Sequence, residues 1–575
     1  KDSVGEWRKR SDAPVGMIVG STGWKGSNVS LQSWGERGVS ELTARVVRAS
    51  FPKGTLAVRI RDALGPVFSD EQFAQAFPAR GRPAASPGAL ALVSVLQYAE
   101  GLSDRQAADQ VRARIDWKYL LGLELDDPGF DFTALAGFRA RLIEHGLEEK
   151  VLDVILDQCS QHGLLRAGGR QRTDSTHVLA AVRTLNRMEF VGETLRASLE
   201  ALAAAAPQWL APLIDAGWAE RYGARIDAYR FPKGEDVRTR WAQQVGRDGY
   251  LILDAVAASG APKWLREIPA VQVLARAWEQ QYRRDGEEVC WREGRDLPPS
   301  RERLASPYDT DARYGLKRGN GWCGYKVRLS ETCDPDVPHL ITHVATTDAT
   351  VTDTEMTATI QQGLAARQML PGEHAVDAGY VTAAHIVAAR SEYAVDLLGP
   401  VGMDTHQAEH FPHSDFRIDR QAKSVTCPNG KASASWSAQR KSSGTPVTRV
   451  HFAASDCAAC PLQNKCTTAS NGKWGRSLTL LPEDQQQVLQ TRRREQVTEP
   501  WQQRYHIRAG IEATIAQTTR RTGIRRTRYT SVDKTHLGHL FAATAVNVIR
   551  IDTWLTSTPL GQTRTSHLTQ LDLAS

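Results

Sequence analysis

In the stretch Gly324-Tyr-Lys-Val-Arg-Leu-Ser330, apolar side chains alternate with polar ones. A period of two predicts a strand with one buried face and one exposed face. A turn rich in aspartate and proline follows at 334–338, and a second apolar run follows at 340–344. The two runs therefore predict an antiparallel hairpin.

Downstream of the hairpin, helical and strand-like patterns alternate. A helical period begins at Thr354, and Thr382 is placed to cap a second helix over 383–390. Short apolar runs at 373–379 and 394–398 favour buried strands. Hairpin, helix, strand, helix and strand in this order predict an α/β fold around a mixed sheet.

Residues 50–165 also show helical periodicity. Ser103 can cap one helix there, and Asp131 or Thr133 can cap another. The pattern fits either a small helical bundle or a DNA-binding domain of helix-turn-helix type. A further helical stretch reaches to about residue 304 and carries no nucleotide-binding or metal-binding signature.

The composition is that of a globular protein, with 41% hydrophobic and 24% charged residues over 575 positions. It excludes wholesale disorder and collagen. No run approaches the roughly 18 to 20 apolar residues of a membrane span, and the first thirty residues lack a secretory pattern. We therefore expect no membrane partner and a cytoplasmic location. The net charge of +7 is compatible with a nucleic-acid partner without requiring one.

Basic charge is concentrated between Trp501 and Thr530, where seven arginines accompany one acid. Alone, such a block is commonly a solvated face. Here Tyr505, Arg508 and Glu512 fall on one side of a predicted helix, directly beside an apolar stripe. The stripe consists of Ile507, Ile511 and Ile515. A carboxylate on this support, among cations that can hold a polyanion, is suited to metal binding.

Two aspartates lie at the ends of strand-like runs. Asp174 stands in Thr-Asp-Ser-Thr-His, after a pair of glycines, and Asp377 stands in Val-Asp-Ala-Gly-Tyr. We expect Gly379 to turn the backbone away and leave the Asp377 carboxylate at the end of the sheet. Each aspartate by itself could equally be a turn or capping residue.

In combination, these two motifs and Tyr-x2-Arg-x3-Glu at 505–512 resemble the acidic triad and signature of bacterial insertion-sequence DDE transposases. The resemblance covers residues 50–555, and the motifs at 306–313 and 324–326 fit it as well. One position departs from the family pattern. Where a lysine often follows seven residues after the glutamate, this chain has Thr519.

The resemblance implies a ribonuclease-H-like mixed-sheet core with a helical N-terminal domain and two insertions. Asp174 would lie on its first strand, Asp377 on a later strand and Glu512 on a following helix. The implied divisions are an irregular segment (1–47), a helical N-terminal DNA-binding domain (48–163), the first core strand (164–183), a helical insertion (184–305), the catalytic core (306–400), a polar insertion with cysteines (401–499), the core helices around Glu512 (500–555) and a tail (556–575).

Phosphodiester cleavage develops charge on the attacking and leaving oxygens, which two Mg²⁺ ions can stabilise. Mg²⁺ takes oxygen ligands, and Mn²⁺ can substitute for it. We therefore assign metal binding and catalysis to Asp174, Asp377 and Glu512. By resemblance, Tyr505 and Arg508 contact the DNA backbone. Further DNA contacts are assigned to Lys326, Arg520, Arg521, Arg525, Arg526 and Arg528.

The function implied is DNA transposition: cleavage at the element's terminal inverted repeats and strand transfer into double-stranded target DNA. We expect a homodimer on DNA, because the two ends of the element must be brought together. We also expect the protein to be associated with the nucleoid. The alternatives are a non-catalytic relative that acts as a repressor, and a nuclease of the same fold without strand transfer. A tyrosine recombinase using Tyr505 would leave the ordered acids unexplained.

Cys427, Cys457, Cys460 and Cys466 form a separate candidate site. Four thiolates with one Cys-x2-Cys pair can bind structural zinc. Unligated thiols and disulfides are the alternatives, and disulfides are disfavoured in the cytosol. We expect the other four cysteines to be packing residues, and His177 and His506 to have structural roles.

Overall fold

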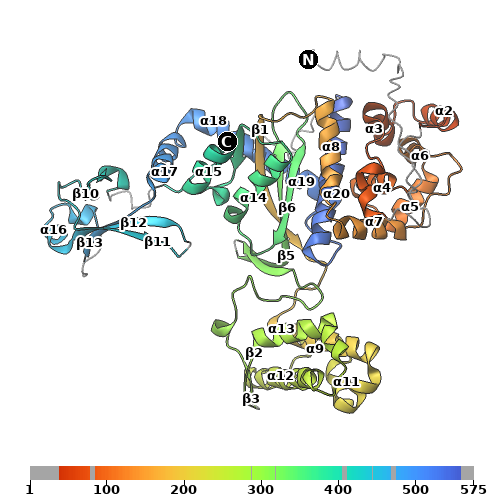
Figure 1. Cartoon of the computed structure of the whole chain (residues 1–575), viewed down its shortest axis with the longest axis horizontal. Helices are drawn as coiled ribbons and strands as arrows, with labels where there is room; N and C mark the ends of the chain where they lie inside the picture. Colours follow the sequence, from red (N-terminus) through yellow and green to blue (C-terminus); the bar gives the residue numbers. More distant parts are fainter. Residues whose placement is uncertain are drawn as a thin grey trace, which may run out of the picture.

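The computed structural model describes residues 38–77, 84–286, 288–317, 319–403, 411–442, 444–467 and 474–557. In Figure 1 a central sheet is flanked by N-terminal helices, a helical insertion and a small β-rich insertion. Most of the predicted irregular segment and of the tail lie outside the described residues. The irregular segment nevertheless ends earlier than predicted, because helix α2 begins at Glu41.

The central sheet has the strand order β6–β5–β1–β7–β8. Strand β5 is antiparallel to β1 and β6, whereas β7 and β8 run parallel to β1. The bounds are β1 (Arg170–Leu179), β4 (Arg313–Lys317), β5 (Asn320–Thr332), β6 (Ile341–Asp348), β7 (Glu373–Val376) and β8 (Asp396–Leu398), with β4 pairing with the start of β5. The predicted α/β mixed sheet of ribonuclease-H-like type is confirmed.

Two helices provide the crossovers that parallel strands require. Helix α14 (Asp353–Ala366) connects β6 to β7, and its first turn is closed by a capping box between Thr352 and Glu355. Helix α15 (Ala383–Tyr393) connects β7 to β8, and Thr382 caps it as predicted.

The prediction that β5 is half-buried is wrong. Arg328, expected on the exposed face, is fully buried. Its guanidinium donates to the Asp353 carboxylate at 2.9 Å and to the Val351 carbonyl at 2.9 Å. Because these groups neutralise and solvate the cation, the polar face of the strand can be covered by the start of α14.

The N-terminal helices share one hydrophobic core with the sheet. Helices α4 and α8 pack against the C-terminal helix α20 (Val532–Leu555), and Figure 1 shows α8 and α20 side by side. Ser103 caps α5 as predicted, and the Asp131 carboxylate accepts the backbone N–H of Thr133 at the start of α7. The helices are α2 (Glu41–Ser50), α3 (Leu56–Leu64), α4 (Pro87–Glu100), α5 (Asp104–Ala113), α6 (Ile115–Leu121), α7 (Thr133–Glu144) and α8 (Lys150–Gln161).

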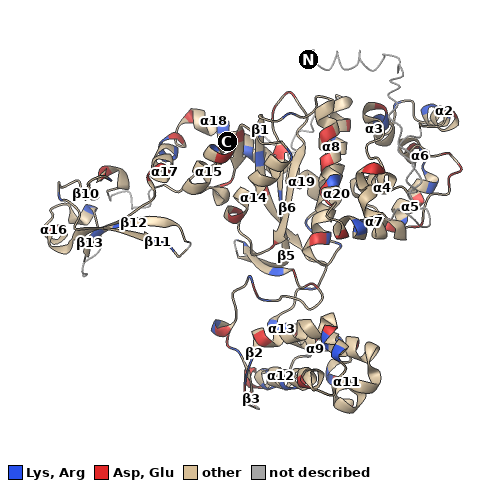
Figure 2. Cartoon of the chain, in the orientation of Figure 1, with Lys and Arg blue, Asp and Glu red and all other residues tan. Residues whose placement is uncertain are grey.

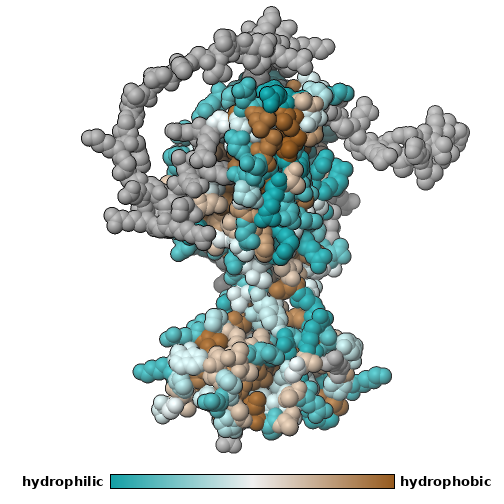
Figure 3. All heavy atoms as spheres, turned by 90° about the vertical axis from the view of Figure 1, so that its right-hand side faces the viewer, coloured by the Kyte–Doolittle hydropathy of each residue, from teal (hydrophilic) through white to brown (hydrophobic). Residues whose placement is uncertain are grey.

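The helical insertion between β1 and β4 has a hydrophobic core of its own. Figure 3 shows it joined to the main body through a narrow waist. It contains α9 (Arg187–Ala205), α10 (Pro207–Leu210), α11 (Ala216–Tyr222), α12 (Glu235–Ala257), α13 (Pro269–Gln281) and a hairpin of β2 (Tyr282–Asp285) and β3 (Glu288–Trp291). Within the described ranges, no helix combines the length and apolar surface that a bilayer crossing needs.

The second insertion is a small β structure that projects from the body in Figure 1. It consists of β9 (Arg417–Asp419), β10 (Ser424–Thr426), β11 (Ser435–Arg440), β12 (Pro446–Ala453), α16 (Ala454–Ala458) and β13 (Trp474–Leu480). Helix α17 (Glu483–Glu495) then returns to the body and packs against α15.

The predicted continuous helix around residue 505 is broken. Helix α18 (Glu499–Tyr505) passes into a 3₁₀ turn, η9 (His506–Ala509), before α19 (Gly510–Thr522) begins. A 3₁₀ turn has three residues per turn, so it rotates the two helices relative to each other. Consequently Ile511 and Ile515 enter the main core, whereas Ile507 packs in a separate small cluster. Residues 523–531 are irregular, so the helical character predicted there ends at Thr522.

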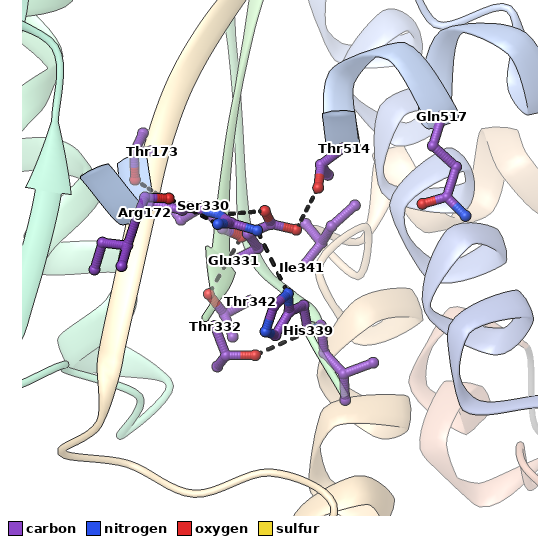
Figure 4. Close-up of polar contacts among 12 residues, drawn as sticks. Arg172, Thr173, Ser330, Glu331, Thr332, His339, Ile341, Thr342, Thr514 and Gln517 are labelled. Carbon is purple, nitrogen blue, oxygen red and sulfur yellow. Dashed lines mark hydrogen bonds and ion pairs between the residues drawn. The ribbon is translucent and has the colours of Figure 1, made fainter. Parts of the chain in front are cut away.

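A buried ion-pair network joins the sheet to the C-terminal helices (Figure 4). The carboxylate of Glu331 on β5 is fully buried. It accepts from Arg172 on β1 at 2.7 Å, from Arg550 on α20 at 2.6 Å and from Thr514 on α19 at 2.6 Å. Burial alone would raise the pKa of Glu331, but the two guanidinium groups and the hydroxyl hold it below its ordinary value.

The same network fixes the start of α19. Arg172 also donates to the backbone carbonyl of Ile507 at 2.7 Å. A Cβ atom at Gly510 would lie only 2.0 Å from the Arg172 guanidinium, so glycine is what permits this close approach. Strand β1 and the segment that carries Arg508 and Glu512 are therefore tied together at one point.

Replacing Glu331 with Gln should destabilise the protein by about 3–5 kcal/mol, because buried Arg172 and partly buried Arg550 lose their counter-charge. Urea or thermal unfolding followed by circular dichroism measures the loss, with Glu392→Gln at an exposed position of α15 as control. Since the pKa of Glu331 is lowered, its contribution is present above the ordinary pKa and is lost as the pH falls through the lowered value. The difference between wild type and variant should shrink in acid, and an equal difference at all pH values would contradict the assignment.

Candidate functional site

One guanidinium group contacts all three predicted acids. Arg508 Nη2 lies 2.5 Å from Asp174 Oδ2 and 3.4 Å from Asp377 Oδ2, and Nη1 lies 3.0 Å from Glu512 Oε1. The acids are up to 338 positions apart in the sequence (512 − 174). The fold thus brings together the three acids and Arg508 from the sequence motifs.

Each acid is held by a different element. Asp174 lies in the middle of β1, and its side chain is only 14% exposed. Asp377 is the residue directly after β7 and is 52% exposed, whereas Glu512 lies in the first turn of α19 and is 68% exposed. As expected, the backbone turns at Gly379 and leaves Asp377 at the end of β7, although Gly379 does not adopt a left-handed conformation. A short 3₁₀ turn, η6 (Ala378–Tyr380), redirects the backbone instead.

The site carries an excess of negative charge. Burial raises the pKa of Asp174, although Arg508 opposes this shift. Burial would lower the pKa of Arg508, but Asp174 and Asp377 beside it raise that pKa above the usual range. One guanidinium offsets only one of three carboxylates. In addition, the buried Nε of Arg508 has no hydrogen-bond partner among the described residues.

Of two other predicted DNA contacts, Tyr505 lies near Arg508 and the two aspartates, whereas Lys326 lies further along the sheet, opposite His177 of β1. Tyr505 stacks on Trp501 with ring centroids 4.9 Å apart, and burial raises the pKa of its hydroxyl. Lys326 on β5 donates to the Val351 carbonyl at 2.8 Å, and burial lowers the pKa of its ammonium group. Lys326 is therefore already engaged with the protein in this structure.

The five arginines after α19's centre are exposed. They are Arg520, Arg521, Arg525, Arg526 and Arg528. Arg525 donates to the Thr176 hydroxyl at 2.8 Å, and residues 525–527 exchange backbone hydrogen bonds with Leu179. This basic segment is thereby held along the end of β1, the strand that carries Asp174. Figure 2 shows acidic and basic residues mixed over the rest of the molecule.

A fourth acid near the cluster, Asp353, was not among the residues predicted for the site. Asp353 accepts from the hydroxyl of Ser175, the neighbour of Asp174, at 3.0 Å. Its other oxygen pairs with buried Arg328, so its charge is already offset. The capping box at Thr352 and Glu355 is the sequence signal that could have placed Asp353 at the start of α14.

Among the described residues, no three His, Cys, Asp or Glu side chains stand in position to hold a metal ion as they are. The three acids do not form such a group either, and one carboxylate oxygen of each contacts Arg508. The four cysteines of the second insertion do line one common pocket. His177 is exposed and lies beside Trp322, and His506 is exposed.

Two protein-family models match the chain. Residues 45–141 match a family described as a transposase domain (DUF772), and residues 426–552 match a family described as a transposase DDE domain. The second match includes Tyr505, Arg508 and Glu512, whereas Asp174 and Asp377 lie before it. No curated protein and no solved structure matches the chain.

The two matched families are both transposase domains, and they occur in the predicted order, N-terminal helices first and the Glu512 helix last. The two matches therefore support an insertion-sequence transposase of the DDE type.

Proposed function

We propose that this transposase cleaves DNA strands at the ends of its element and joins them to target DNA, with Asp174, Asp377 and Glu512 as the metal-binding catalytic acids. The observation that carries the proposal is the convergence of these three carboxylates on one guanidinium group. A purely structural cluster would not need two of its acids to be about half exposed or more.

The donor set fits Mg²⁺ or Mn²⁺. All three candidate ligands offer carboxylate oxygens, which hard divalent cations prefer, and no thiol or imidazole lies among them. The surplus of negative charge favours cation binding. When bound, such ions would offset the charge that develops on the attacking and leaving oxygens of the phosphodiester.

Arg508 is a competitor for the same oxygens. As long as its guanidinium contacts all three acids, it holds them together and partly neutralises them. If the three acids held a cation, Arg508 would be free to contact a DNA phosphate, which its five donors suit. Arg508 would thus pair with the three acids in the free protein and with a DNA phosphate in the complex.

The exposed arginines beside β1 support a DNA path across the site. Arg525 contacts Thr176, which lies two residues from Asp174 and therefore on the same face of β1. A DNA strand bound to this basic segment would run alongside the three acids. We assign recognition of the terminal repeats to the N-terminal helices, and pairing of two ends to a homodimer on DNA.

The runner-up is a relative that binds DNA without cutting it. Its support is the departure at Thr519 and the occupation of the acids by Arg508. The two functions differ in one readout, which is metal-dependent strand cleavage and joining on the element's own ends.

Asp174→Asn, Asp377→Asn and Glu512→Gln should each reduce strand cleavage by about a thousandfold or more, because each removes a charged ligand at the reacting phosphate. DNA binding, measured by gel shift, should persist. Cleavage is measured with labelled terminal-repeat DNA and Mg²⁺. Glu499→Gln on α18 is the control, and wild-type cutting by any one of the three variants would remove that acid from the site.

Arg508→Gln should tighten Mn²⁺ binding by about tenfold, which corresponds to about 1.4 kcal/mol of lost competition. The same change should weaken binding of the DNA ends. Calorimetric titration with Mn²⁺ tests the first effect. Arg504→Gln is the matched control, because Arg504 pairs with Glu373 and Asp396 instead. Unchanged Mn²⁺ affinity in the Arg508 variant would show that the metal does not use these oxygens.

Replacing Arg525, Arg526 and Arg528 together with Gln should flatten the salt dependence of DNA binding by roughly two to three in the logarithmic slope. Three released phosphate contacts predict this change. The control replaces three exposed arginines of the helical insertion, Arg238, Arg247 and Arg295. If both triple variants keep the wild-type slope, the basic segment is not in the DNA path.

A further inference from the structure

The second insertion has too small a hydrophobic core for its size. Among its described residues, six buried hydrophobic side chains form the core cluster, and they come from strands of three to eight residues and a loop. These six are Phe416, Val425, Val450, Phe452, Leu478 and Leu480. Units of this size usually need a disulfide or a metal ion to fold.

Four cysteines gather at one side of this core. Cys427 follows β10, Cys457 lies in α16, and Cys460 and Cys466 lie in the turns after it. All four line one pocket of about 20 Å³, which has room for roughly one water-sized particle. Three of them, Cys427, Cys457 and Cys466, also pack against the core described above. The thiols are therefore gathered from separate turns into one place.

Hydrogen-bond donors point at the sulfurs. The backbone N–H of Lys431 donates to Cys427 Sγ at 3.4 Å, and that of Arg476 donates to Cys457 Sγ at 3.4 Å. The side-chain amide of Asn429 donates to Cys460 Sγ at 3.4 Å. Donors of this kind stabilise thiolates, which are the form that binds metals.

The backbone is shaped to bring these donors close. Gly430 has a φ of +76° and closes the turn after Cys427, so that the next N–H meets the sulfur. A Cβ atom at Gly475 would lie 2.4 Å from Cys457 Sγ, so glycine lets β13 pass directly beside the thiol. Two glycines thus serve contacts to sulfur and not to the apolar core.

We propose that Cys427, Cys457, Cys460 and Cys466 bind one structural Zn²⁺ ion that stabilises the second insertion. Four thiolates satisfy the tetrahedral preference of zinc and select it over magnesium. All four cysteines are unpaired in the structure, so no disulfide uses them. The four thiols do not form a metal-binding group as they stand, so binding of the ion requires their side chains to rearrange. The proposal is independent of the DNA-cleaving function, since none of these residues contacts the three acids.

The test measures metal in the full-length protein, purified under reducing conditions without added metal. We expect about one zinc ion per chain by plasma mass spectrometry. Replacement by Co²⁺ should give the absorption of a tetrahedral thiolate complex. Cys457→Ser combined with Cys460→Ser should remove both signals, whereas Cys290→Ser in β3, outside the cluster, should leave them unchanged.

Chelation of the wild-type protein gives a readout that does not depend on variants that fold. Removing zinc should speed amide hydrogen exchange in β11 to β13 by at least about tenfold and leave β1 and β5 unchanged. Absence of zinc together with failure to take up Co²⁺ would overturn the proposal. Iron in place of zinc, or a disulfide among the four cysteines in the native protein, would overturn it equally.

Discussion

The buried carboxylate of Glu331 and its two arginines hold the functional half of this molecule together. Arg172 precedes Asp174 by two residues on β1, so both side chains lie on the same face of that strand. Arg172 also binds the carbonyl of Ile507, the residue before Arg508. The Arg172 guanidinium therefore fixes the distance between β1, which carries Asp174, and η9, the turn that precedes Glu512. Because a buried charge without its partner is costly, the arrangement resists partial opening.

The insertions leave this arrangement intact because each has its own core. The helical insertion leaves the sheet after β1 and returns before β4, and the neighbouring pairing of β1 with β5 continues over nine residue pairs. The N-terminal helices behave differently, since they share the core of the sheet and of α20. DNA recognition by these helices would therefore be rigidly connected to the acids, whereas each insertion is connected through the segments by which the chain enters and leaves it.

The match to a transposase DDE domain begins at residue 426, directly before Cys427, and ends within α20. The cysteines and the Glu512 helix thus belong to one matched segment. Physically, the β-rich insertion is followed by α17, which packs on α15 and delivers the chain to α18 and η9. The β-rich insertion is therefore connected through α17 and α18 to the segment that carries Arg508, although the two sites share no side chain.

Local periodicity and hydrogen bonds within a few residues were enough to predict the order of the elements from β5 to β8, the placement of the three acids along them, and the capping of α5 and α15. The strands of the two insertions were not predicted. The sequence did not determine that Arg328 is buried, that η9 divides the predicted helix at Arg508, or that Arg508 contacts all three acids. It also gave no sign of the role of Glu331. The contacts of Glu331 with its two arginines, and of Arg508 with the two aspartates, join residues 131 to 334 positions apart. Arg328 finds its carboxylate 25 positions away, on the next helix, α14. In each case packing in space selects the partner of the charge, and this leaves no pattern along the chain.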